Sequence, residues 1–186
     1  DKKSERARVL KERNALSTAK RGELNHALCS FLSDFLDSVK VQTIGAFLPI
    51  GSEPDISEVL KNWLRAGAAR QVFLPVTEGK TMRFAFWDPA KPLKIGRFSV
   101  PEPTSDLFSE PPLLLVPCVA LNKQGYRLGY GAGYYDRYLP RCRNAVALGV
   151  AFEAQRVPEA AADRGGRRLD GIVTERKVYR GTDEFE

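Results

Sequence analysis

"LLLVPCVAL", residues 113–121, is the most hydrophobic segment of the chain and decides the fold class. A continuous apolar run of this length is typical of a strand that is buried on both faces of a parallel sheet. Such sheets occur in α/β proteins, where helices cover the faces. We therefore expect residues 113–121 to form a central strand.

The segments around this run alternate between strand-like and helix-like patterns. Further strands are expected at residues 41–50, 71–76, 82–87, 145–152 and 170–179, and helices at residues 2–14, 17–39 and 54–66. A further helix is expected to start within "GYYDRYLPR" (133–141). This alternation predicts an α/β three-layer sandwich around a mostly parallel sheet with helices on both faces. Residues 88–112 carry six of the twelve prolines and predict irregular structure without an assigned function.

Length and composition predict one domain over residues 1–186, with residues 1–14 as a mobile basic helix. No run of about 18 apolar residues is present, so we expect no membrane span. The charged N-terminal segment has no apolar signal core, and three widely spaced cysteines indicate a reducing compartment, so a cytoplasmic location is expected. A single histidine, His26, excludes a multi-histidine zinc site and disfavours a Ser-His-Asp triad. Nothing in the sequence reports oligomeric state, and we expect a monomer.

The formal net charge is +6, and eight of the 29 basic residues fall within the first 21 positions. A basic segment of this kind suits nucleic acid or a polyphosphate ligand, and it also occurs as an ordinary solvated helix. Charge alone leaves these alternatives open.

"LGYGAGYYDR", residues 128–137, has glycine at positions 129, 131 and 133. Closely spaced glycines let successive backbone N–H groups point toward one anion. Arg127 places a permanent cation beside them, and Asp136 supplies an oxygen ligand of the kind that Mg²⁺ prefers. The spacing is neither the dinucleotide fingerprint nor a Walker A loop. By pattern alone the segment is a candidate phosphate and metal site or a tight loop with solvated charges.

The longer stretch "VPCVALNKQGYRLGYGAGYYDRYL" (116–139) resembles the signature of the 5-formyltetrahydrofolate cyclo-ligase family. The family pattern R-L-G-x-G-x-G-Y/F-Y-D-R is met at every fixed position from Arg127 to Arg137, and the likeness extends to the closing "IVTE" (172–175). The resemblance implies an ATP- and Mg²⁺-dependent ring closure of 5-formyltetrahydrofolate, in polyglutamylated form or not, to 5,10-methenyltetrahydrofolate. In that reaction the formyl oxygen is activated by phosphorylation, and ADP and phosphate are released.

The resemblance also implies roles for individual residues. Arg127, Asp136 and Glu53 would be catalytic, Asp136 would bind Mg²⁺, and Asp163 would be a second Mg²⁺ ligand, although the acids near the C-terminus depart from the family spacing. The nucleotide would be bound by Lys2, Arg6, Arg127, Leu128, Gly129, Tyr130, Gly131, Ala132, Gly133, Tyr134 and Tyr135. Lys2 and Arg6 stand four residues apart, which places both cations on one face of a helix.

"FLPIGSEPDI", residues 47–56, matches the place where the family binds the folate pterin. Glu53 would accept hydrogen bonds from the pterin, whose amino-pyrimidinone edge offers adjacent N–H donors. Leu48 and Tyr134 would complete the folate contacts. Glu53 and Asp55 also stand where acidic residues favour the start of a helix, so a structural role is the alternative. Ile56 and Asn122 differ from the usual family residues, threonine and aspartate.

Two other functions are compatible with parts of the sequence. A nucleic-acid-binding domain would use the N-terminal cations with Tyr126, Tyr130, Tyr134 and Tyr135 as stacking surfaces, although it leaves Asp136 and Glu53 without a role. A kinase with a different acceptor would use the glycine-rich segment alone. The resemblance favours a small folate substrate and no nucleic-acid partner.

Overall fold

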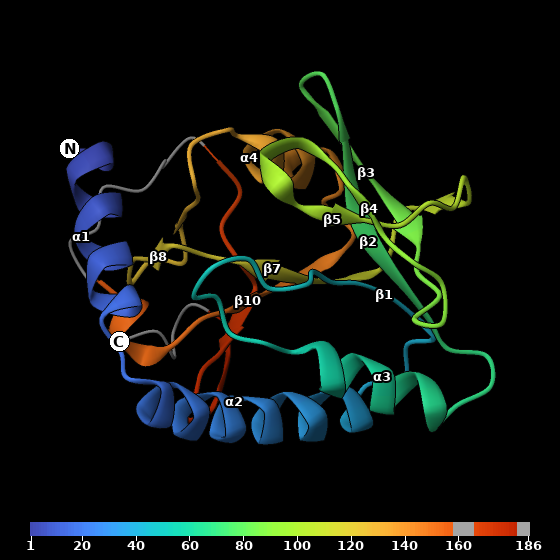
Figure 1. Cartoon of the computed structure of the whole chain (residues 1–186), viewed down its shortest axis with the longest axis horizontal. Helices are drawn as coiled ribbons and strands as arrows, with labels where there is room; N and C mark the ends of the chain where they lie inside the picture. The colour runs from blue at the N-terminus through green and yellow to red at the C-terminus, as the bar shows by residue number, and fades with distance from the viewer. Residues whose placement is uncertain (158–165, 182–186) are drawn as a thin grey trace.

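The computed structural model describes residues 1–157 and 166–181, which are built around one eight-stranded sheet (Figure 1). The strand order is β12-β11-β10-β7-β1-β2-β3-β6. The strands are β1 (Thr43–Gly45), β2 (Gln71–Glu78), β3 (Thr81–Phe86), β6 (Phe108–Ser109), β7 (Leu113–Pro117), β10 (Val146–Val150), β11 (Gly171–Val173) and β12 (Val178–Arg180). From β11 to β2 all neighbours are parallel, whereas β12, β3 and β6 pair antiparallel at the two edges. The predicted mostly parallel α/β sheet is confirmed.

Strand β7 is central, because it pairs with β1 on one side and with β10 on the other. Its leucines are buried alternately in two apolar clusters, with Leu113 and Leu115 on one face of the sheet and Leu114 on the other. The strand is shorter than the predicted residues 113–121. Beyond Pro117 the chain leaves the sheet, and β8 (Ala120–Leu121) pairs instead with β9 (Arg127–Leu128).

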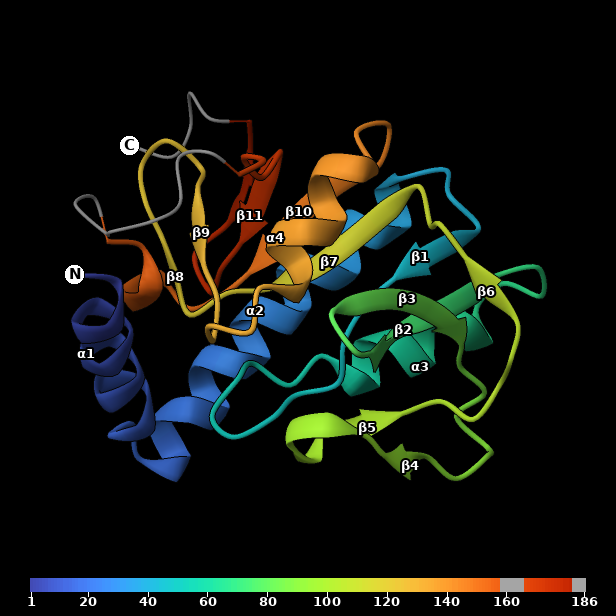
Figure 2. The same cartoon turned by 90° about the horizontal axis from the view of Figure 1, so that it is seen from above.

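Helices lie on both faces of the sheet, as predicted (Figure 2). Helix α2 (Thr18–Ser38) and helix α3 (Ser57–Arg65) cover one face, and the short helix α4 (Tyr134–Tyr138) packs on the other against β3. Helix α1 (Lys2–Asn14) stands at one end of the sheet, beside β8. The side chain of Ser17 caps α2 by accepting from the backbone N–H of Lys20.

Three predicted elements differ from the structure. Helix α3 begins at Ser57 rather than at residue 54, because the Asp55 carboxylate accepts from the Ser57 N–H and holds the preceding residues in a turn. Only residues 43–45 of the predicted strand 41–50 pair as β1, and the residues after Ala46 form a loop. Residues 170–179 contain most of two strands, β11 and β12, instead of one.

The remaining elements are short. They are β4 (Lys94–Ile95), β5 (Pro101–Glu102) and the 3₁₀ turns η1 (Arg97–Ser99), η2 (Leu139–Arg141) and η3 (Glu153–Gln155). Within the described residues no helix is both long enough and apolar enough to cross a bilayer.

Candidate active site

The glycine-rich connection between β9 and α4 needs glycine for two different reasons. Gly131 has a φ of +115° and Gly133 a φ of +78°, which side chains rarely allow. Gly129 has an ordinary φ, but a Cβ there would lie 2.7 Å from Nη2 of Arg127. The segment is therefore shaped by backbone conformation at two glycines and by the close approach of a cation at the third.

Helix α1 brings its cations to this glycine segment. Nε of Arg6 donates to the carbonyl of Gly129 at 2.6 Å, and both Lys2 and Arg6 line the pocket described below. Helix α4 contains five residues, so its dipole adds little positive potential. An anion at this place would be held mainly by the side-chain cations and by backbone N–H groups.

Arg127 and Asp136 form an ion pair at the same place. The guanidinium of Arg127 is buried and donates through Nε and Nη2 to the carbonyl of Pro117, at 3.2 Å and 2.9 Å. Its Nη1 lies 3.5 Å from Oδ1 of Asp136, whose side chain is 42% exposed. The buried cation is thus fixed in place, while the carboxylate stays accessible from the pocket.

Glu53 lies in the loop after β1 and is 6% exposed. Its Oε1 accepts from the Ile50 N–H at 2.9 Å, and its Oε2 accepts from the Tyr130 hydroxyl at 3.0 Å. Burial raises the pKa of the Glu53 carboxyl, and these two hydrogen bonds oppose the rise together with the charges of Arg13 and Arg127. The bond to Tyr130 joins the pterin loop predicted from the sequence to the glycine-rich segment.

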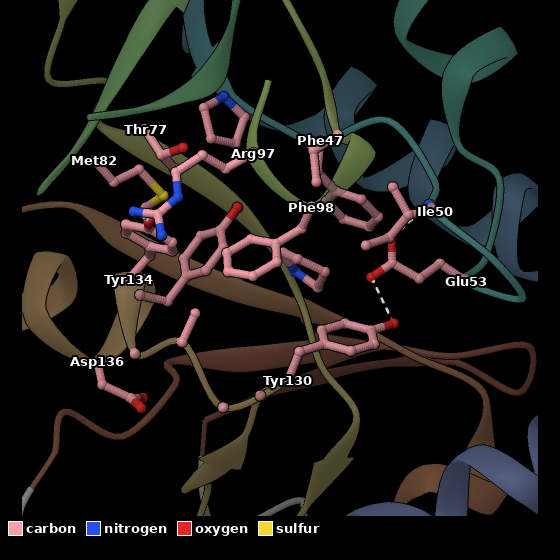
Figure 3. A pocket seen from close by; sticks show the side chains of 18 of the residues that line it. Phe47, Ile50, Glu53, Thr77, Met82, Arg97, Phe98, Tyr130, Tyr134 and Asp136 are labelled. Carbon is pink, nitrogen blue, oxygen red and sulfur yellow. Dashed lines mark hydrogen bonds between the residues drawn. The ribbon is translucent and has the colours of Figure 1, made fainter. Parts of the chain in front are cut away.

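One pocket of about 860 Å³ connects these groups (Figure 3). Glu53 and Asp136 lie toward opposite ends of it, with Phe98 and Tyr134 between them. The residues singled out from the sequence that line it are Lys2, Arg6, Leu48, Glu53 and 127–136. Leu128 packs its side chain into an apolar cluster with Val9, Val119 and Ala120. Asp163 lies outside the described residues.

The tyrosines of the glycine-rich segment have separate environments. The Tyr134 hydroxyl donates to the carbonyl of Gly79 in the turn between β2 and β3. The Tyr135 hydroxyl is buried and has no hydrogen-bond partner among the described residues, and burial raises its pKa well above the ordinary value. The Tyr130 hydroxyl is bonded to Glu53. The three hydroxyl groups thus face the protein, although the Tyr130 side chain as a whole is 40% exposed.

Residues 97–102 are site residues that sequence reasoning missed. Arg97 donates to the carbonyl of Gly79 at 2.9 Å, and Phe98 lines the pocket although it is 67% exposed and has a φ of +57°. Glu102 is buried and accepts from the Thr77 N–H at 3.0 Å. This proline-rich segment has no periodicity, so only its tertiary position reveals the role. A positive φ at phenylalanine is also invisible in a single sequence.

Of the three acidic residues that line this pocket, Glu53 and Glu102 are buried and Asp136 is exposed, and no cluster of three or more metal-ligating side chains occurs in residues 1–157 and 166–181. Mg²⁺ commonly keeps several waters and binds through one or two carboxylates together with the phosphates of a substrate. The accessible Asp136 beside a cationic segment fits an ion that arrives with a nucleotide rather than a resident structural metal.

Comparison with known proteins decides the family. A sequence model of the 5-formyltetrahydrofolate cyclo-ligase family matches residues 1–175. The chain belongs to this family of enzymes. The family match agrees with the resemblance seen in residues 116–139, and it extends over α1, residues 47–56 and the glycine-rich segment.

Two curated members show how far the similarity extends. A 5-formyltetrahydrofolate cyclo-ligase of Mycoplasma pneumoniae is 30% identical over 94% of this chain and 99% of its own length. The enzyme of the same name from Escherichia coli K12 is 27% identical, over 92% of this chain and 98% of its own length.

The fold is shared with solved structures of this family. The structure of Aquifex aeolicus 5,10-methenyltetrahydrofolate synthetase has a TM-score of 0.83 and 31% identity, and the match covers 96% of this chain and 92% of that one. A 5,10-methenyltetrahydrofolate synthetase from Mycoplasma pneumoniae has a TM-score of 0.78 and 27% identity, covering 94% and 99%.

Proposed function

We propose that this enzyme closes the ring of 5-formyltetrahydrofolate to give 5,10-methenyltetrahydrofolate, at the expense of ATP and with Mg²⁺. Family membership supports the reaction class. One observation in this chain carries the proposal. Glu53, the α1 cations Lys2 and Arg6, and the glycine-rich segment line the same pocket. A kinase with another acceptor would leave the buried Glu53 carboxylate without a function.

In the proposed reaction the formyl oxygen attacks the γ-phosphorus of ATP and displaces ADP. N10 of the folate then attacks the formyl carbon and loses its proton, and the oxygen departs as phosphate, which takes up that proton. Mg²⁺ bound with the nucleotide would offset negative charge on the phosphates. The protein's own contribution is positioning and charge neutralisation, because no side-chain nucleophile is required.

Each end of the pocket would hold one substrate. Glu53 would accept two N–H bonds from the pterin edge and so set the orientation of the ring. Lys2, Arg6 and Arg127 would bind the phosphates, and Asp136 would hold the metal ion. The formyl group would then lie between the two ends, near Phe98 and Tyr134.

A monomeric state stays a prediction from the sequence. A cytoplasmic location and a second Mg²⁺ ligand at Asp163 stay predictions from the sequence.

The test is turnover followed by the absorbance of the methenyl product, with ATP, Mg²⁺ and 5-formyltetrahydrofolate. We expect one ADP and one phosphate per product, and no product when ATP is omitted. Calorimetry with ATP–Mg²⁺, in the presence and absence of the folate, separates the alternatives. Nucleotide binding without folate binding would indicate a kinase of another acceptor, and salt-sensitive RNA binding without nucleotide binding would indicate a nucleic-acid module.

A further inference from the structure

Arg13 is a buried cation at the end of α1 and lies outside the set of residues that line the pocket. It is 5% exposed, and two hydrogen bonds hold its guanidinium. Nε donates to Oγ of Ser52 at 2.8 Å, and Nη2 donates to the Tyr130 hydroxyl at 2.7 Å. Its Nη1 is buried without a partner in the part of the chain that the structure describes. Taking the charge of an arginine out of water costs free energy of folding, so the buried position of Arg13 calls for a reason.

The bond to Tyr130 determines where the tyrosine proton points. A phenol has one O–H donor, and an arginine can only donate. Because Arg13 occupies a lone pair of the Tyr130 oxygen, the hydroxyl proton is free to point to Oε2 of Glu53, which accepts at 3.0 Å (Figure 3). Arg13, Tyr130 and Glu53 thus form a directed chain of hydrogen bonds from α1 to the pterin end of the pocket.

Several groups surround Glu53, and they shift the pKa of its carboxyl in different directions. Arg13 from α1 and Arg127 from β9 are positive, and both lower the pKa of the Glu53 carboxyl against the effect of burial. Tyr130 lowers it through its hydrogen bond. The thiol of Cys118 and the hydroxyl of Tyr135 also interact with Glu53, and burial raises the pKa of both, so they stay neutral near pH 7. Arg127 is already paired with Asp136. Arg13 is the cation whose hydrogen bonds lead to Glu53.

We propose that Arg13 is a positioning residue, which acts through Tyr130 to hold Glu53 as an oriented, ionised acceptor for the pterin. The inference rests on the proposed function, because it assigns Glu53 to the folate. It also adds a second task to α1, which then serves the nucleotide end through Lys2 and Arg6 and the folate end through Arg13.

The first test needs no activity. The pKa of the Glu53 carboxyl is measured by ¹³C NMR titration of the ligand-free wild type, Arg13→Met, Arg13→Lys and Tyr130→Phe. We expect Arg13→Met to raise it by about one unit, at the low end of what a nearby opposite charge causes. Arg13→Lys keeps the charge and should move the pKa less. Tyr130→Phe removes only a hydroxyl and therefore tests the same chain of bonds should Arg13→Met fold poorly.

The matched control is Arg21→Met. Arg21 lies on α2 and donates to the backbone carbonyl of Arg13, so this variant weakens the attachment of α1 without touching Tyr130. We expect a lower melting temperature and an unchanged Glu53 pKa. An Arg13→Met variant that behaves like Arg21→Met, with a loss of stability and no change in the Glu53 pKa, would overturn the inference.

Kinetics provide the second readout. In Arg13→Met the KM for 5-formyltetrahydrofolate should rise, by up to about tenfold at pH values below the Glu53 pKa, which is the limit that a one-unit pKa increase sets, while the KM for ATP stays near the wild-type value. Combining Arg13→Met with Tyr130→Phe should add little, because both break one chain of bonds. If the wild type does not convert the folate, the proposed function fails, whereas the NMR titration still decides the role of Arg13.

Discussion

Nη1 of Arg127 lies 3.5 Å from Oδ1 of Asp136, and the two side chains differ sharply in exposure, at 6% and 42%. The arginine is fixed from behind by two hydrogen bonds to the carbonyl of Pro117. In the proposed function, the carboxylate would exchange its partner for a metal ion, while the cation would keep its position beside the phosphates. This pair marks the end of the pocket at which we propose that the nucleotide binds.

Asp136→Asn should lower turnover by at least about a hundredfold, which corresponds to about 3 kcal/mol of transition-state stabilisation. The side chain is partly exposed and Arg127 keeps its bonds to Pro117, so thermal unfolding should change little. Turnover is measured across a range of Mg²⁺ concentrations, and calorimetry should show that folate binding persists. Wild-type turnover at all Mg²⁺ concentrations would exclude Asp136 as the metal ligand.

Glu53→Gln should abolish folate binding and stabilise the fold at neutral pH. Because burial raises the folded-state pKa of Glu53, the ionised carboxylate opposes folding. The resulting loss of stability is absent below the unfolded-state pKa of about 4.3, grows as the pH rises, and is complete above the folded-state pKa. Melting temperatures of the variant and the wild type should therefore differ at neutral pH and converge near about pH 4. A variant that is less stable than the wild type at neutral pH would contradict this reading of Glu53.

Gly131→Ala should cost about 1–3 kcal/mol, because its φ of +115° is strained for any residue with a Cβ. The nearest atom to that Cβ would be the Arg6 guanidinium at 3.7 Å, so the cost comes from the backbone and not from a clash. Denaturant unfolding measures the loss, and the KM for ATP should rise. Gly22→Ala in the second turn of α2 is the control. Its Cβ would meet nothing within 4 Å, and the helix should gain about 0.5–1 kcal/mol.

Lys2→Ala should raise the KM for ATP and leave the KM for the folate unchanged, because Lys2 lines the pocket and is proposed to bind the phosphates of the nucleotide. Added salt should weaken the effect, since the lysine is exposed and its charge is screened. Lys3→Ala is the matched control, as Lys3 is a neighbouring exposed cation that does not line the pocket. If the two substitutions raise the KM for ATP equally, Lys2 contributes only through the overall positive charge of the N-terminal segment.

Much of the fold could be predicted from local pattern. The apolar run from Leu113 predicted the central strand because only a strand buried on both faces is hydrophobic at every position. Helix α2 was predicted from the helix-like pattern of residues 17–39. The end of β7 could not be predicted, because the apolar residues Val119 and Ala120 are buried equally well in another cluster, against α1.

The sequence by itself determined the glycine-rich segment, its neighbouring cation and acid, and the family, because these are local features with fixed spacing. Only the tertiary structure decided that Arg13 reaches Tyr130 across 117 positions of the chain and that Phe98 borders the same pocket. Contacts of this kind depend on how the helices and loops pack around the sheet. A buried arginine and a solvated one are the same letter in the sequence, and the surroundings that distinguish them exist only after folding.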